Sequence, residues 1–433
     1  MLNIGEYRNK ADRLADLLPW VALIAPGVVL NKDGSFQRSF RFRGPDLGSA
    51  TEAELVGLCA RANNALKRLG SGWALFFDAE RLEAQHYPSS EFPDAASWLV
   101  DEERRAAFEE AKQGQHFESR YHLTLLYMPP PDAQARTESA LVERDREGEG
   151  TGGVRNWRQE MARFRDETVR VLDLLSGFLP EIRALDDTET LTFLHGTIST
   201  KRHTVAVPEV PMYLDGVLVD TPLTGGLEPM LGEKHIRTLT ILGFPNTTRP
   251  GILDALNHRD FAYRWVTRFI PLDKTAATKV LTRLRRQWFA KRKSITAVLR
   301  EVLTNEAAPL VDSDADNKAL DADAALQALG GDHVGFGYLT TTITVFDEDA
   351  QAAEDKARAI ERIVNGLGFT CICESVNAVE AWLGSLPGHV YANVRQPLIH
   401  TLNLAHLMPL SAVWAGPVRN AHLDAPPLFY AET

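Results

Sequence analysis

Glycine-rich and nucleophile motifs are the first places to look for chemistry in this sequence, and none of them is complete. A phosphate-binding loop needs two glycines separated by four residues and followed by a lysine and a hydroxyl side chain, because these groups hold the phosphates. The nearest stretch, residues 226–235, has five residues between its glycines and Glu233 in place of the lysine. A Gly-x-Ser-x-Gly nucleophile elbow is also missing. We therefore expect no catalytic residue, no cofactor-binding residue and no ATP or magnesium site in this chain.

Two other patterns carry little chemical meaning in their context. Gly148, Gly150 and Gly153 fit the dinucleotide-binding pattern Gly-x-Gly-x-x-Gly, but they follow a run of charged residues rather than a strand. We interpret them as part of a linker. Cys371 and Cys373 alternate on a predicted strand and face one side of it, with no histidine or acidic residue at a ligand spacing, so we interpret them as core cysteines.

The histidines show no metal-binding spacing. His400 and His406 are six residues apart on a predicted helix, whereas a helical zinc pair uses positions i and i+4. We therefore expect no metal site. An alternative hypothesis is an enzyme whose site assembles from dispersed residues such as His195, His203 and Asp215, which no spacing argument can detect.

A basic stretch is the strongest charge anomaly of the chain. Nine basic and no acidic residues occur in it: Lys274, Lys279, Arg283, Arg285, Arg286, Lys291, Arg292, Lys293 and Arg300. Leu281, Trp288 and Ile295 recur every seven residues, which predicts a long amphipathic helix over 274–303 with one apolar stripe. Its basic face is either solvated beside the acidic stretch 312–323 or a docking face for an acidic partner or anionic inner-leaflet lipid. Single-stranded nucleic acid is the least favoured ligand.

The elements that would position these residues form an α+β unit over 1–205. Alternating residues predict strands, and capping residues and apolar periodicity predict helices. We expect a hairpin over 28–42, a helix over 51–69, a strand over 73–77, a helix over 95–112, a strand over 121–127, and helices over 154–179 and 188–200. Residues 129–153 are polar, charged and rich in glycine at their end, so we expect a flexible insertion there.

A second α+β subdomain is predicted over 206–433. We expect strands over 236–242, 261–270, 337–346 and 369–373, with helices over 274–303 and 347–365. The last strand, helix and strand are in the order of a right-handed crossover. The predicted fold class is therefore α+β, with mixed or antiparallel sheets covered by helices, in two subdomains.

Composition places the chain among ordinary globular proteins. It has 433 residues, 44% of them hydrophobic and 24% charged, and a formal net charge of −11, which disfavours a general nucleic-acid-coating role. Its 3 cysteines, an odd number, favour a reducing compartment. The apolar segment 17–30 contains Pro19 and Pro26 and is shorter than the roughly 20 residues that a membrane-spanning helix needs.

Several motifs in this order resemble those of one known family. They are Leu18-Pro19-Trp20, Asn31-Lys32-Asp33-Gly34-Ser35-Phe36-Gln37-Arg38, Gly70-Ser71-Gly72-Trp73-Ala74, Leu242-Gly243-Phe244-Pro245 and Ser385-Leu386-Pro387-Gly388-His389. Together they resemble the N-terminal region of the CagE/TrbE/VirB family of conjugal transfer ATPases in type IV secretion systems, over essentially the whole chain. The resemblance implies that the RecA-like motor domain of the family, with its Walker A and B motifs, ATP and magnesium, is absent from these residues.

The resemblance also implies a role in assembly. It implies a non-catalytic docking domain on the cytoplasmic face of the inner membrane, which holds the motor on inner-membrane subunits and on neighbouring copies. The candidate docking residues for a partner or for anionic lipid are Trp20, Arg285, Arg286, Lys291, Arg292 and Lys293. Two alternatives remain, the dispersed-site enzyme and a stand-alone adaptor or regulator of the secretion ATPase.

Overall fold

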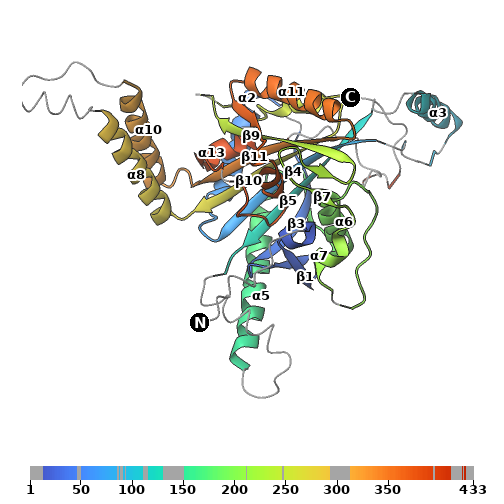
Figure 1. The fold of residues 1–433 in the computed structure, drawn as a ribbon, viewed down its shortest axis with the longest axis horizontal. Helices are drawn as coiled ribbons and strands as arrows, with labels where there is room; N and C mark the ends of the chain where they lie inside the picture. The colour runs from blue at the N-terminus through green and yellow to red at the C-terminus, as the bar shows by residue number, and fades with distance from the viewer. Residues whose placement is uncertain are drawn as a thin grey trace, which may run out of the picture.

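One antiparallel sheet organises the chain in a computed structural model (Figure 1). The structure describes residues 13–45, 50–84, 87, 91–92, 94–110, 116–129, 151–210, 212–245, 248–292, 313–393, 395–410, 422, 424 and 425. The sheet has 13 strands: β1 (Trp20–Ala25), β2 (Val28–Asn31), β3 (Phe36–Arg43), β4 (Trp73–Glu83), β5 (Phe117–Tyr127), β6 (Glu181–Ala184), β7 (Leu223–Thr224), β8 (Met230–Leu231), β9 (Lys234–Gly243), β10 (Tyr263–Leu272), β11 (Phe336–Asp347), β12 (Thr370–Cys373) and β13 (Leu398–His400).

The strand order joins the two halves of the sequence. It runs β1-β2-β3-β5-β4-β10-β11-β9-β8-β7, with β12 paired to β9, β13 to β11 and β6 to β3. The pairing of β4 with β10 spans seven residue pairs, from Tyr263↔Arg81 to Phe269↔Leu75. The sheet is thus continuous across the predicted boundary between residues 205 and 206, and the division into two subdomains stays a prediction.

Two crossover units build the centre of the sheet. In each, a helix links two strands that are both antiparallel to a third strand between them, so the linked strands are parallel. The units are β3–α2–β4 around β5 and β11–α11–β12 around β9. The strand–helix–strand order predicted at the end of the chain is therefore present, with β9 inserted between its two strands.

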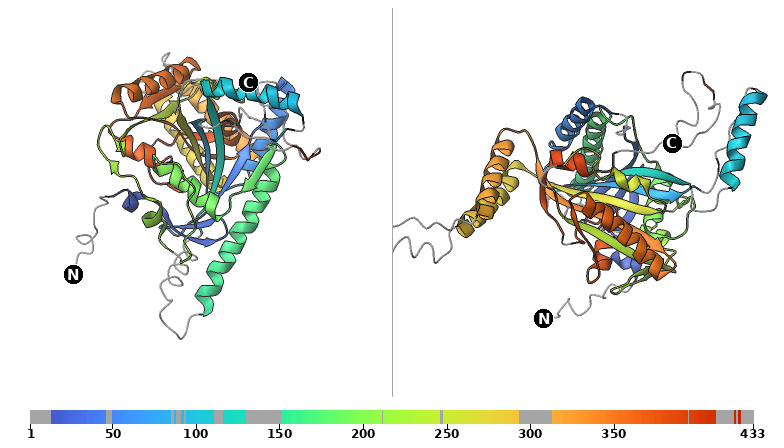
Figure 2. Two further views of the ribbon diagram at one scale, coloured as in Figure 1. Left: turned by 90° about the vertical axis from the view of Figure 1, so that its right-hand side faces the viewer. Right: turned by 90° about the horizontal axis from the view of Figure 1, so that it is seen from above.

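Helices cover both faces of this sheet (Figure 2). Their bounds are α1 (Leu14–Leu17), α2 (Glu52–Leu66), α3 (Ala95–Glu110), α5 (Thr151–Leu175), α6 (Asp187–Ile198), α7 (Leu214–Leu218), the 3-10 helix η3 (Asp254–His258), α8 (Lys274–Arg292), α10 (Ser313–Gly330), α11 (Ala350–Gly366), α12 (Ala378–Leu383) and α13 (Thr401–Leu407). The helices α2, α5, α11 and α13 supply apolar side chains to the main core on one face. The helices α6, α7 and α12 pack with Trp20 in a second cluster.

Alternation along the strands explains the two faces. Trp265 and Phe269 of β10 lie in the main core with Leu339 and Ile343 of β11. The even-numbered residues of β10, Arg264, Val266 and Arg268, point to the opposite face, because successive side chains of a strand alternate. That face contains buried polar residues, among them Arg264 and Arg268.

Most predicted elements are present with small shifts in their ends. The helix predicted over 51–69 is α2, and its Thr51 cap forms reciprocal hydrogen bonds with Glu54. The long helix predicted from 274 is present as α8 as far as Arg292, and residues 293–303 lie outside the described residues. The linker interpretation is wrong at its end, because Gly153 lies in the first turn of α5; Gly148, Gly150 and residues 130–150 lie outside the described residues.

The apolar segment 17–30 is a hairpin rather than a helix. Its residues form β1 and most of β2, which pair in antiparallel register. Among the described residues, no helix is both long and apolar enough to cross a membrane. His400 also departs from its predicted helix, because it ends β13 and caps α13 by accepting a hydrogen bond from the backbone N–H of Asn403 at 3.1 Å.

Candidate functional site

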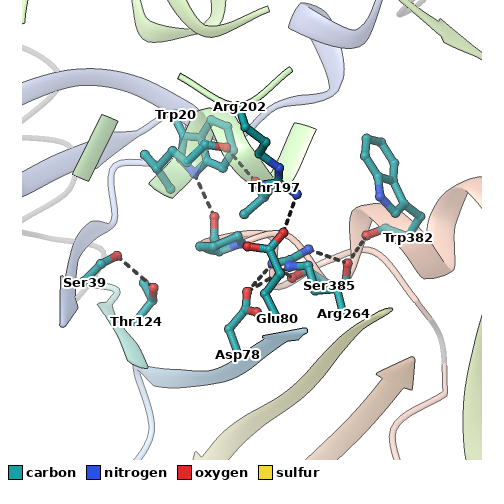
Figure 3. A network of polar contacts seen from close by, with 12 residues as sticks. Trp20, Ser39, Asp78, Glu80, Thr124, Thr197, Arg202, Arg264, Trp382 and Ser385 are labelled. Carbon is teal, nitrogen blue, oxygen red and sulfur yellow. Dashed lines mark hydrogen bonds and ion pairs between the residues drawn. The ribbon is translucent and has the colours of Figure 1, made fainter. Parts of the chain in front are cut away.

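Residues 384–393, which we call the junction loop, bring together segments that are far apart in the sequence (Figure 3). Trp20 Nε1 donates a hydrogen bond to the carbonyl oxygen of Pro387 at 2.7 Å. Gly388 has a φ of 89°, and a Cβ at this position would lie 2.1 Å from Gln37 Oε1. A glycine is required here both by the left-handed backbone and by this close approach. Three of the quoted motifs therefore meet at one place.

A buried ion pair fixes the start of the junction loop to the sheet. Arg264 and Asp78 are 4% and 1% exposed. Arg264 Nε donates to Asp78 Oδ2 at 2.9 Å, and its Nη2 contacts the same oxygen. The guanidinium also donates to Ser385, from Nη1 to Oγ at 3.2 Å and from Nη2 to the carbonyl oxygen at 3.1 Å. Burial raises the pKa of Asp78 to about 6, against the attraction of Arg264, which lowers it.

A second buried arginine fixes the rest of the junction loop. Arg268 is 1% exposed, and its Nη1 donates to the carbonyl oxygens of Ala392 at 2.7 Å and His389 at 2.9 Å. Its Nη2 donates to Thr340 Oγ1 at 3.0 Å and to the carbonyl oxygen of Asn393 at 3.3 Å. Burial lowers the pKa of Arg268 to about 10. The site can hold chain segments together, and its charged groups are closed off from solvent.

Trp20 is the first predicted docking residue, and its side chain is fully buried. Its indole packs in the cluster formed with α6, α7 and α12. A side chain with no exposed surface cannot contact a partner directly. Trp20 therefore contributes to holding the junction loop and is not part of the docking surface that we propose.

The predicted basic residues from Lys274 to Arg292 lie on α8, which forms with α10 a helical hairpin that projects from the edge of the fold (Figure 1). The hairpin is held by Ala277 and Leu281 of α8, which pack with Leu329 at the end of α10 and with Phe336. Leu281 thus lies on the predicted apolar stripe.

The basic face of this hairpin is partly paired with the acidic stretch and partly exposed. Arg285 Nε lies 2.9 Å from Asp323 Oδ1, so part of the basic face contacts the acidic helix. Arg283 and Arg286 are exposed, and no ion pair joins either of them to another described residue. Lys291 and Arg292 lie on α8 in a part whose side chains are not described, and Lys293 lies outside the described residues.

The residues of the dispersed-site hypothesis separate into two groups. Asp215 forms an ion pair with Lys32, with 2.9 Å between Oδ2 and Nζ. His195 and His203 do come together, with ring centroids 4.5 Å apart, but their acidic neighbour is Asp220. Nothing in the sequence spacing pointed to Asp220, because it follows His195 by 25 residues and a short helix lies between them.

The cysteines are free thiols. Cys371 is buried and Cys373 half-buried on β12, and burial raises the pKa of each to about 11. Both thiols are thus protonated at neutral pH, which agrees with their interpretation as core residues.

Two described protein families match parts of this chain. Residues 27–135 match the family described as "Type IV secretion system ATPase VirB4/TrbE, N-terminal domain". Residues 175–305 and 298–395 match the "CagE, TrbE, VirB family, component of type IV transporter system". The chain belongs to the VirB4/TrbE family. The Asp78–Arg264 pair joins the two matched regions, because each region contributes one of its partners.

Curated relatives agree with this family. The chain is 33% identical over 428 residues to the conjugal transfer protein TrbE of Rhizobium radiobacter, which covers 96% of this chain and 51% of the relative. It is 21% identical over 419 residues to the type IV secretion system protein virB4 of Brucella melitensis, covering 93% of this chain and 47% of the relative. The VirB4/TrbE chain described here therefore spans about half the length of these relatives.

Proposed function

We propose that this chain is the docking and assembly part of a type IV secretion ATPase and that it hydrolyses no ATP by itself. The match of its residues 27–135 to the family's N-terminal domain carries the proposal. The ATP-hydrolysing RecA-like domain, with its ATP and magnesium, would lie outside these 433 residues, since the relatives are about twice as long.

The proposed partners are inner-membrane subunits of the secretion system and neighbouring copies of the ATPase, at the cytoplasmic face of the inner membrane. A continuous sheet pinned by buried arginines supports this role, because a rigid scaffold can transmit movement from a motor to its partners. The α8–α10 hairpin is the proposed contact with acidic groups, since it projects from the scaffold and exposes Arg283 and Arg286.

An ATPase assay tests the non-catalytic part of the proposal. The purified chain should show no ATP hydrolysis above a blank, because the sequence contains no phosphate-binding loop. Turnover that survives stringent purification and is lost on a single substitution in this chain would contradict the proposal. The DNA after codon 433 offers a second test, since an in-frame Walker A motif would support a motor domain that follows these residues.

Reversing exposed charge on α8 tests the docking surface. In the double variant Arg283→Glu and Arg286→Glu, binding to vesicles with anionic headgroups should weaken about 30-fold or more at low salt, because each basic residue near such a surface contributes about 1 kcal/mol and the two new carboxylates add repulsion. The difference should shrink at high salt as the charges are screened. Vesicle co-sedimentation measures it. Arg285 stays unchanged, because its reversal would repel Asp323.

The matched control reverses two exposed arginines on and next to α2, Arg61→Glu and Arg68→Glu. This variant changes the net charge by the same amount at a different place. An equal loss of binding in the control, or a loss that salt leaves unchanged, would show that α8 is a solvated face with no docking role.

A further inference from the structure

Three metal-ligating side chains meet on the surface next to the end of α6. His195 belongs to the last turn of α6, His203 to the coil after it, and Asp220 follows α7. The potential ligand atoms of the three side chains all lie within 4.8 Å of one another. His203 and Asp220 are exposed, whereas His195 is 3% exposed, so the cluster has one buried and two accessible members.

Hydrogen bonds orient the carboxylate of this cluster. Asp220 Oδ1 accepts bonds from Ser199 Oγ at 2.6 Å and from Thr221 Oγ1 at 2.8 Å. The second oxygen, Oδ2, is turned toward the imidazole of His195, with 3.2 Å between it and Nε2. Burial would raise the pKa of Asp220, but the two hydroxyl donors and the nearby imidazole outweigh it and hold the pKa below its ordinary value. The carboxylate is therefore held with its Oδ2 toward His195.

The buried imidazole is the member of the cluster whose polar atom is left unsatisfied. His195 Nε2 lies 3.2 Å from Asp220 Oδ2 without the alignment that a hydrogen bond needs, and it has no other partner among the described residues. Buried polar side-chain atoms in native proteins nearly always have a partner, and a bound ion can take that place. The rings of His195 and His203 lie next to each other, with their centroids 4.5 Å apart and their planes inclined at 61°.

We infer that His195, His203 and Asp220 bind one divalent transition-metal ion of the zinc class. Two imidazole nitrogens and one carboxylate oxygen form a common zinc ligand set, which leaves one coordination position for water or for a further ligand. Ligand distances of about 2 Å require the three ligand atoms, now within 4.8 Å of one another, to move closer together. The hydroxyls of Ser199 and Thr221 supply the outer support that such carboxylate ligands usually have.

Lys201 is the one cation that competes with a metal among the described neighbours, with its Nζ 3.6 Å from Asp220 Oδ2. Its side chain is 63% exposed, so it can move away when an ion binds. The metal would fasten the coil after α6 to the helix, because the described residues between Ser199 and Tyr213 form no helix or strand. The ion would therefore restrict the movement of this coil relative to α6.

Zinc titration of the purified chain tests the inference. After removal of metal with a chelator, the chain should bind one zinc ion, measured by elemental analysis after dialysis, and its Tm should rise by about 3 °C at a hundredfold excess over Kd. His203→Ala should weaken binding about 100-fold or more and abolish the shift in Tm. Lys201→Ala should strengthen binding, because it removes the competing charge.

His258→Ala is the matched control, since His258 is also exposed and lies outside the cluster, and it should bind zinc like the unchanged chain. His203 is exposed, so its loss leaves the fold intact, and far-ultraviolet circular dichroism checks this. The inference is overturned if the unchanged chain retains no zinc, or if His203→Ala and Asp220→Asn bind it as tightly as the control.

Discussion

Replacing Arg264 by methionine should lower the free energy of unfolding by about 3–5 kcal/mol, because it leaves the buried carboxylate of Asp78 without its partner. The two side chains are 4% and 1% exposed, so water cannot replace the lost contact. The carbonyl oxygen of Ser385 loses its donor in the same variant. Urea unfolding followed by circular dichroism measures the change.

The loss of stability in Arg264→Met should be larger at high pH than at low pH. Burial already raises the pKa of Asp78 in the folded chain to about 6, and loss of the Arg264 charge raises it further. A carboxyl whose folded pKa lies above its unfolded value destabilises the fold as pH rises through the window between the two. The gap between the variant and the unchanged chain should therefore be small at pH 5, where Asp78 is protonated in both, and larger at pH 8.

Two further variants decide whether the buried pair is the cause. Arg202→Met removes the ion pair between Arg202 and Glu80, which is on β4 like Asp78. Because the Arg202 side chain is 45% exposed, we expect the free energy of unfolding to fall by less than about 1 kcal/mol. The double variant Asp78→Leu and Arg264→Met should recover most of the stability, because no charge stays buried without a partner. Equal losses in Arg202→Met and Arg264→Met, or no recovery in the double variant, would contradict the argument.

The sequence predicts the core face of this fold well and the polar face poorly. Along β10, Trp265 and Phe269 alternate with Arg264 and Arg268, which by itself is typical of a strand with one solvated face. The arginines are buried because the junction loop covers them, and its residues lie more than 100 positions away in the chain. Local periodicity contains no information about such a distant cover.

One sequence motif lies in the junction loop, although the sequence alone does not show which segments it contacts. The motif Ser385-Leu386-Pro387-Gly388-His389 contributed to the family resemblance, and the structure shows that it receives Arg264, Trp20 and the hairpin around Gln37. Trp20 is one of the candidate docking residues that the sequence predicts. Its indole instead packs inside the chain, because the segment folds as a hairpin.

Replacing Arg268 by methionine should lower the free energy of unfolding by about 3 kcal/mol and loosen the junction loop. Arg268 donates to the carbonyl oxygens of His389, Ala392 and Asn393, and these buried acceptors lose their donor together. Limited trypsin digestion gives the local readout, since cleavage at Arg395 should accelerate relative to other sites. Thermal unfolding gives the global one.

A lysine variant distinguishes the hydrogen bonds of the Arg268 guanidinium from the effect of its charge alone. Arg268→Lys keeps the charge, but an ammonium lacks the planar fork that lets Nη1 reach Ala392 while Nη2 reaches Thr340. The lysine variant should therefore recover less than half of the stability and leave Arg395 readily cleaved. Arg358→Met on α11, which removes an exposed ion pair with Glu354, should change neither readout. Full recovery by lysine would mean that charge alone holds the junction loop, and the carbonyl contacts would then carry no specific role.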